Sequence, residues 1–136
     1  MTRLALDASA LIHLVEGSTA ARERLSRRLA EVLATPTGQV VASQLARLEC
    51  RVKPLRDGNR ALLDEYDAIF AAEELLLVDV TANVLDRATE LRAQHGFKTP
   101  DAIHLASAIE AGADAFLTGD AGLAKCPDVT VEVFGP

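Results

Sequence analysis

Residues 3–17 read RLALDASALIHLVEG, a short apolar run that ends in Asp7 and passes directly into a helical pattern. A run that is apolar at successive positions and bounded by turn residues is typical of a strand buried on both faces of a parallel sheet. The segment that follows ends at Gly17, a residue typical of helix C-termini. The stretch therefore predicts the first strand–helix unit of an α/β protein.

The alternation of strand and helix continues along the chain. Further short strands, rich in leucine or β-branched residues, are expected at 39–43, 74–80, 114–118 and 129–134. Helical spacing is seen at 19–33, 43–53, 59–74, 81–96 and 99–112, with stops at Pro54 and Gly96 and starts at Thr81 and Thr99. This order predicts a three-layer α/β/α sandwich around a mainly parallel sheet, in a single domain spanning residues 1–136.

The composition bounds the class of protein. Hydrophobic residues make up 49% of the 136 and aromatic residues only 4%, so the core is expected to be aliphatic. No apolar run approaches the length of a membrane span, and Asp7 and Glu16 interrupt the apolar N-terminal stretch, which predicts a cytoplasmic protein. Cys50 and Cys126 form no CxxC pair and are expected to be free thiols.

The net charge of −6 argues against broad electrostatic binding of nucleic acid. The same charge fits a basic partner. It also fits carboxylates that are gathered in one pocket and neutralised by divalent cations. Charge alone does not choose between these two explanations.

Three aspartates are expected at one edge of the sheet. In a parallel α/β sheet each strand ends, and each following helix begins, at the carboxyl edge, where ligands bind. Asp7 closes the first strand, Asp120 follows the fourth, and Asp101 lies at the start of the last helix. Carboxylates gathered there repel one another unless cations bind them, and Mg²⁺ and Mn²⁺ prefer such oxygen ligands. The edge is therefore a candidate metal site, with Ser9 and Thr118 beside it.

Each aspartate also has an ordinary structural explanation. Asp7 could cap the first helix. Asp120 could cap the short turn AGLAK (121–125) that follows Asp120 itself. In TPDAIHLASA (99–108), Thr99 is a candidate N-cap and Asp101 complements the helix dipole. Glu49 lies roughly 9 Å into its helix at 1.5 Å per residue, and spacing alone does not distinguish it from a surface glutamate.

The chain resembles the PIN-domain nucleases, and among them the VapC-type toxins of toxin–antitoxin systems. Four segments carry the resemblance, in order: LALDASALIHL (4–14), SQLARLEC (43–50), TPDAIHLASAIEAGAD (99–114) and FLTGDAGLAKCP (116–127). The resemblance implies a PIN-like fold with five parallel strands in the order 3-2-1-4-5. It places the acidic centre at Asp7, Glu49, Asp101 and Asp120, with Ser9 and Thr118 as accessory hydroxyls. Leu123 stands where many relatives have an aromatic residue.

The activity implied by the resemblance is that of a metal-dependent endoribonuclease acting on a structured cellular RNA, a transfer or ribosomal RNA. Asp7 and Asp101 are expected to hold Mg²⁺, with Mn²⁺ as an alternative, and Glu49 and Asp120 a second ion. Attack by water predicts 5′-phosphate and 3′-hydroxyl ends. The cations expected on the RNA backbone are Arg47, Arg51 and Lys53, with Arg3, Arg22, Arg24, Arg27, Arg28 and Arg56 as further candidates.

The resemblance also implies protein partners. A VapB-type antitoxin is expected to lay its C-terminal segment over the acidic edge, where an arginine could compete with metal for the carboxylates. The apolar face of residues 60–70, with Tyr66, Ile69 and Phe70, predicts a homodimer or antitoxin groove, and core packing explains it equally well. No membrane partner is expected.

Three other functions fit parts of the sequence. LLLVDV (75–80) is similar to a strand ending in the acceptor aspartate of a receiver-type phospho-acceptor domain, Asp79, but the acidic pair and late Lys-Pro of that class are missing. A metal-independent ribonuclease would use His13, His95 and His104, which lie in three separate helical contexts. His104 is instead expected to be buried and fully hydrogen-bonded. A catalytically silent PIN-like binding protein also remains open.

Overall fold

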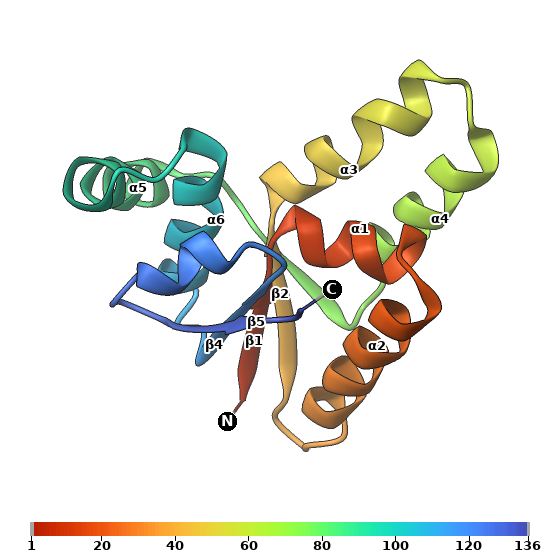
Figure 1. The fold of residues 1–136 in the computed structure, drawn as a ribbon, viewed down its shortest axis with the longest axis horizontal. Helices are drawn as coiled ribbons and strands as arrows, with labels where there is room; N and C mark the ends of the chain where they lie inside the picture. Colours follow the sequence, from red (N-terminus) through yellow and green to blue (C-terminus); the bar gives the residue numbers. More distant parts are fainter. Residues whose placement is uncertain (1, 136) are drawn as a thin grey trace.

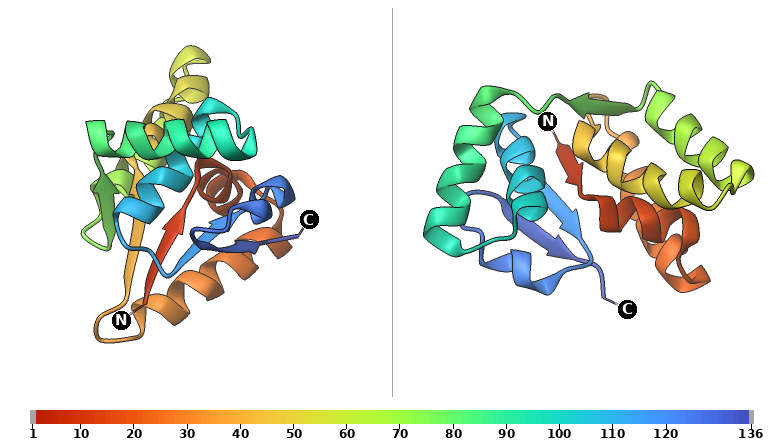
Figure 2. Two further views of the ribbon diagram at one scale, coloured as in Figure 1. Left: turned by 90° about the vertical axis from the view of Figure 1, so that its left-hand side faces the viewer. Right: turned by 90° about the horizontal axis from the view of Figure 1, so that it is seen from above.

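A computed structural model describes residues 2–135, in which five parallel strands form one sheet covered by helices on both faces (Figures 1 and 2). The strands are β1 (Arg3–Leu6), β2 (Gln39–Ser43), β3 (Leu75–Val78), β4 (Ala115–Thr118) and β5 (Thr130–Val133). All neighbouring pairs are parallel, in the order β3-β2-β1-β4-β5. The predicted strands, the sandwich and the 3-2-1-4-5 order are confirmed.

The helices form two layers, one on each face of the sheet (Figure 1). Strand β1 shows how the faces divide. Leu4 and Leu6 join one core cluster and Ala5 joins the other, because successive side chains of a strand point to opposite faces. The first layer contains α1 (Ala8–Glu16), α2 (Thr19–Leu33), α3 (Gln44–Arg56) and α4 (Arg60–Ala71), and the second contains α5 (Ala82–His95), α6 (Thr99–Glu110) and the 3-10 helix η1 (Ala121–Lys125).

Both cores are aliphatic, as the composition predicts. The few Phe and Tyr rings are all buried, and so is Leu123. Cys50 and Cys126 are free, as predicted, and both are buried. Within residues 2–135, no helix has the length and apolar character needed to cross a membrane.

The apolar face of α4 is used mainly inside the molecule. Tyr66 and Phe70 are buried in the core, and the Tyr66 hydroxyl donates a hydrogen bond to the Glu16 carboxylate. Ile69 is partly buried and lines an apolar hollow of about 140 Å³. Core packing is therefore the correct explanation for Tyr66 and Phe70, and the predicted surface role of these two is wrong.

Two helix start or stop residues differ from the prediction, and α4 and α6 end at Ala71 and Glu110, short of the predicted 74 and 112. α3 does not stop at Pro54 but runs two residues further, to Arg56. Pro54 lies in the last turn, where its missing amide removes only one helical hydrogen bond, and its ring is buried. α6 begins with Lys98 as its N-cap, because the Lys98 carbonyl already accepts the Ala102 amide, so the predicted Thr99 cap is wrong by one residue.

Candidate functional site

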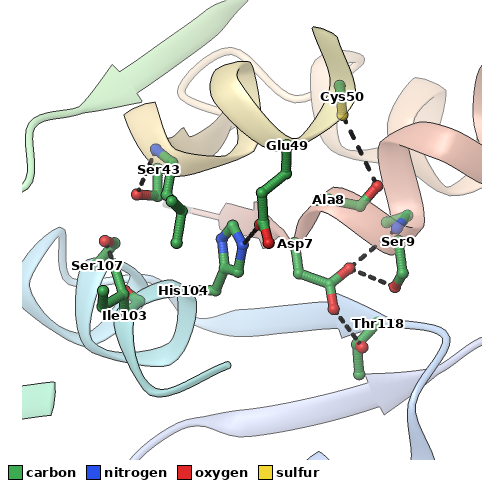
Figure 3. Close-up of polar contacts among 12 residues, drawn as sticks. Asp7, Ala8, Ser9, Ser43, Glu49, Cys50, Ile103, His104, Ser107 and Thr118 are labelled. Atoms are coloured by element: carbon green, nitrogen blue, oxygen red, sulfur yellow. Dashed lines mark hydrogen bonds and ion pairs between the residues drawn. The ribbon is translucent and has the colours of Figure 1, made fainter. Parts of the chain in front are cut away.

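Asp7 follows β1 directly and is buried, with 5% of its surface exposed. Its Oδ1 atom accepts hydrogen bonds from the Ser9 hydroxyl at 2.6 Å and the Ala10 amide at 2.9 Å (Figure 3). Its Oδ2 atom accepts the Thr118 hydroxyl at 2.5 Å. A buried carboxylate is tolerated only when it is hydrogen-bonded or paired, and three donors also fix its orientation. Asp7 is thus the N-cap of α1 and an anchored acid at the sheet edge.

The hydroxyls of Ser9 and Thr118 connect Asp7 to the loop after β4. Each hydroxyl donates to Asp7 and accepts a backbone amide. Ser9 Oγ accepts from Gly119 at 3.1 Å, and Thr118 Oγ1 accepts from Asp120 at 3.0 Å. Since β1 and β4 are neighbours in the sheet, these contacts join segments more than a hundred residues apart. The structure therefore places both predicted hydroxyls against the carboxylate of Asp7.

Asp120 and Asp101 complete the acidic edge in different ways. Asp120 is exposed and caps η1 by accepting the Gly122 amide at 2.8 Å, so the capping explanation is correct for it. Asp101 lies in the first turn of α6, whose N-cap makes no side-chain hydrogen bond. Burial raises the pKa of Asp101, and the charges of Asp120 and Asp7 raise it further. Asp101 is therefore within electrostatic reach of both Asp120 and Asp7.

Glu49 extends from α3 and contacts His104 of α6, with 2.5 Å between Glu49 Oε1 and His104 Nε2 (Figure 3). The His104 side chain is only 3% exposed and that of Glu49 31%. A carboxylate can only accept, so Nε2 donates. His104 Nδ1 has no hydrogen-bond partner among the described residues. The prediction of a buried His104 is confirmed, but that of full hydrogen bonding is wrong because Nδ1 lies buried where no polar group reaches it.

The contact between Glu49 and His104 escaped the sequence analysis. Glu49 has no local signal, and its partner lies 55 residues further along the chain. The available clue was that His104 follows Asp101 by three residues on one helix, and so lies near the acidic edge.

Residues 4–129 match the family model described as PIN domain. The chain belongs to the PIN domain family. No curated protein matches the sequence. Solved structures supply the nearest comparisons, and they share the fold over almost the whole chain.

Three of these structures come from toxin–antitoxin systems. A VapBC2 complex from Rickettsia felis, bound to a DNA fragment from its promoter, has a TM-score of 0.75 at 14% identity, covering 98% of this chain and 99% of that chain. VapC20 of Mycobacterium tuberculosis, described as a sarcin-ricin loop cleaving toxin, has a TM-score of 0.72 at 20% identity, covering 93% and 98%. A toxin–antitoxin complex from Klebsiella pneumoniae has a TM-score of 0.68 at 21% identity, covering 93% and 95%.

The donor chemistry of this PIN domain fits a hard divalent cation, because its candidate ligands are carboxylate oxygens. A cation would also remove the repulsion that raises the pKa of Asp101. Within residues 2–135, however, no three His, Cys, Asp or Glu side chains surround one point. Both oxygens of Asp7 already accept protein hydrogen bonds. The side chains of Asp101, Glu49 and Asp120 would therefore have to turn toward Asp7 to complete a ligand set.

Cys50 follows Glu49 in the PIN domain but faces the core. Its Sγ atom lies 4.0 Å from the Ala8 carbonyl oxygen. Burial raises the pKa of Cys50 to about 12, and the neighbouring charge of Glu49 contributes. The thiol therefore stays protonated at neutral pH and is a poor nucleophile or metal ligand.

The three cations chiefly expected on the RNA backbone lie along α3: Arg47, Arg51 and Lys53. Arg51 forms an ion pair with Asp67 of α4, at 2.8 Å between Nε and Oδ1. Arg47 and Arg51 line a hollow that also includes Asp67, whereas Glu49 faces α6. Lys53 is exposed. Asp67 thus partly neutralises the charge of Arg51, and a role of these side chains toward RNA stays a prediction.

Proposed function

We propose that this PIN domain is a divalent-metal-dependent endoribonuclease, the toxin of a VapBC-type toxin–antitoxin system that cuts a structured cellular RNA. One observation carries the proposal. Asp7 after β1, Asp101 in the first turn of α6 and Asp120 after β4 lie at the carboxyl edge of the sheet, where burial and the charges of Asp120 and Asp7 raise the pKa of Asp101. The likeness to toxin–antitoxin structures over more than nine-tenths of the chain supports it.

Asp7 and Asp101 would hold the metal, with Glu49 and Asp120 nearby to complete its ligands. A bound Mg²⁺ supplies a water of lowered pKa and neutralises charge that develops on the phosphate. Ser9 and Thr118 keep the Asp7 carboxylate in one orientation through their donated hydrogen bonds. Attack of water on phosphorus breaks the bond to the 3′ oxygen, which takes up a proton. The products are a 3′-hydroxyl and a 5′-phosphate.

We also propose a VapB-type antitoxin as the partner. Two of the solved structures most similar to this chain are complexes named for a toxin with its antitoxin. An acidic edge of this kind suits a partner arginine, because guanidinium binds carboxylates with two parallel hydrogen bonds. Self-association as a homodimer and a cytoplasmic location remain predictions.

Two alternative functions lose support. A receiver domain has the strand order 2-1-3-4-5, with the third strand central, whereas β3 is an edge strand here and Asp79 is exposed. A metal-independent ribonuclease needs a matched pair of accessible histidines. His104 is buried against Glu49. His13 on α1 and His95 at the end of α5 belong to helices on opposite faces of the sheet. Neither mechanism accounts for the gathering of carboxylates.

The deciding experiment compares the parent chain with Asp7→Asn on total cellular RNA and maps the new 5′ ends. The parent should create 5′-phosphate ends at a few positions in structured RNAs when Mg²⁺ or Mn²⁺ is present, and none in EDTA. Asp7→Asn should create none. Equal patterns from the two proteins, cyclic-phosphate products, or cleavage in EDTA would each rule out the proposed chemistry.

A further inference from the structure

A hollow of about 510 Å³, lined by none of the acidic residues above, has no part in the proposed chemistry. Its walls come from α1, the start of α2, and the loops after β4 and β5, with His13, Ser18, Gly119 and Phe134 among the lining residues. Its volume is within the range of about 300–1,000 Å³ usual for small-molecule sites. The hollow is therefore large enough for a nucleobase.

The imidazole of His13 is exposed in this hollow and held in one orientation. Nδ1 lies 2.8 Å from the Ser9 carbonyl oxygen, which can only accept, so Nδ1 donates and Nε2 is left as an acceptor. The ring of Phe134 packs against it with the two centroids 5.2 Å apart. All Phe and Tyr rings of residues 2–135 are buried, His104 is buried and His95 is half-buried. Among the rings described, His13 is therefore the exposed one.

Ser9 links the hollow to the acidic edge. Its carbonyl holds His13, and its hydroxyl donates to Asp7 and accepts the Gly119 amide. A Cβ atom at Gly119 would lie 3.0 Å from the Phe134 ring, so a larger residue there would push on that ring. A group seated on His13 is thus next to the residues that would handle the phosphate.

A cation lies at the edge of the same hollow. Arg24 Nη1 donates to the carbonyl of Gly135, a lining residue, at 2.9 Å. Arg24 is exposed, so its other donors can reach solvent. The hollow therefore combines an exposed ring, an acceptor nitrogen and a positive charge, which match the base and the phosphate of one nucleotide.

We propose that this hollow is a nucleobase subsite of the RNA substrate, in which an unpaired base next to the cut phosphate stacks on His13. The inference rests on the proposed ribonuclease function. Single-stranded RNA bases stack on aromatic side chains, histidine included. Stacking uses the face of the imidazole and tolerates any base, since every base has a π-face, and Arg24 pairs with the phosphate alongside.

The test measures RNA binding without cleavage, in the Asp7→Asn background and with EDTA. Labelled short single-stranded RNAs of adenine, cytosine or uracil are titrated with this protein and with versions that also carry His13→Ala or His13→Phe, followed by fluorescence anisotropy. Loss of one stacked base should weaken binding of all three RNAs about five- to tenfold in His13→Ala. His13→Phe keeps a ring and should bind all three RNAs within about twofold of the Asp7→Asn protein.

Equal RNA binding by the Asp7→Asn protein with and without His13→Ala would overturn the subsite. Equal losses of RNA binding in His13→Ala and His13→Phe would also overturn it, provided that both variants melt at the Tm of the Asp7→Asn protein. The outcome is separate from that of the proposed function. If the parent cuts no RNA but His13→Ala still loses binding, the subsite stands and the nuclease proposal fails. If the unsubstituted chain cuts RNA and the His13 substitutions leave RNA binding in the Asp7→Asn background unchanged, the nuclease proposal stands and the subsite fails.

Discussion

The two sides of the acidic edge are built differently. On the side of β1 and β4, Asp7 accepts three hydrogen bonds, and two hydroxyls tie it to the loop after β4. On the side of α3 and α6, Glu49 has one contact, to His104, and Asp101 carries a pKa raised by burial and by its acidic neighbours. The first side is fixed by protein donors, whereas the second has carboxylates that can still turn.

This difference follows from the elements that carry the residues. β1 and β4 are hydrogen-bonded neighbours in a fixed register, so the residues that follow them are held in place by the backbone. α3 and α6 meet only through side chains, such as Glu49 and His104. The comparison suggests a rigid anchor for substrate and metal on one side and adjustable ligands on the other, and each prediction below tests one side.

The largest effect is expected for Asp7→Asn. Asparagine can still cap α1, but it loses the charge and one of the two acceptor atoms. RNA cleavage should fall by roughly a thousandfold or more, while one lost hydrogen bond costs about 1 kcal/mol and lowers Tm by about 3–4 °C. Initial cleavage rates and thermal melts measure the two effects. The rise in Tm that Mn²⁺ gives the parent should also disappear.

An Asp7→Asn protein that retains a tenth of the parent's activity would contradict the anchor role. Asp79→Asn is a matched control, since Asp79 is exposed after the edge strand β3. This variant should cut RNA at the parent's rate.

The second effect concerns the hydroxyl that ties Asp7 to the loop. Thr118→Val keeps the shape of a fully buried side chain but leaves the Asp7 carboxylate and the Asp120 amide each without one partner. We expect a loss of about 2–3 kcal/mol, a fall in Tm of roughly 6–10 °C, and cleavage slowed about 10- to 100-fold. Thr118→Ser keeps the hydroxyl and should recover most of the activity. Parent-like cleavage by Thr118→Val would show that the hydroxyl does not position Asp7.

The sequence predicts the anchored side better than the adjustable one. Asp7 and Asp120 follow buried strands, and the parallel order of the sheet brings them to one edge, so local pattern and topology suffice. The contact between Glu49 and His104 depends on how two helices pack, which no spacing along the chain encodes. Resemblance to a family pointed to Glu49, and only the structure shows what holds it.

The helix boundaries illustrate the same limit on a smaller scale. Thr81 and Gly96 cap α5 as predicted, because capping depends on residues that are neighbours in sequence. Pro54 is tolerated inside α3 because its ring is buried by tertiary packing, which its own sequence neighbourhood does not reveal. The aromatic residues of α4 were equally ambiguous, since an apolar helix face looks the same whether a core or a partner covers it.

The third prediction tests the adjustable side. His104→Leu removes the donor to Glu49, and cleavage should slow by about tenfold because the carboxylate loses its orientation. Glu49 is part exposed, so water can solvate it, and stability should fall by only about 1 kcal/mol, less than for Thr118→Val. His104→Gln keeps an N–H donor and should recover part of the activity. Cleavage rates, and Mn²⁺ affinity by calorimetry, distinguish the two variants.

If His104→Leu cuts RNA and binds Mn²⁺ like the parent, Glu49 does not need His104 for its position. If His104→Leu lowers Tm more than Thr118→Val does, the α3–α6 side is the more rigid one and the comparison is reversed.

The smallest effect is expected from Asp101→Asn on the stability of the protein in EDTA. Burial and the charges of Asp120 and Asp7 raise the pKa of Asp101 in the folded state, so its ionised form opposes folding. At low pH the protonated form of Asp101 causes no repulsion, and the folded state is relatively more stable. This stability is lost as the pH rises through the folded-state pKa of Asp101. At pH 7.5, Asp101→Asn should melt roughly 1–3 °C above the parent, a small shift because the group is partly exposed.

The pH dependence separates this repulsion from the helix dipole. An aspartate in the first turn of α6 is favoured by the dipole by about 0.3–1 kcal/mol, and Asn forfeits that contribution. Below the unfolded pKa, Asp101 is protonated in both states, so repulsion and dipole both vanish and the two proteins should melt together. A Tm for Asp101→Asn that lies above the parent's only at higher pH indicates repulsion among the carboxylates. A Tm below the parent's at pH 7.5 would mean that the dipole outweighs the repulsion, and that Asp101 is stable at this edge without a cation.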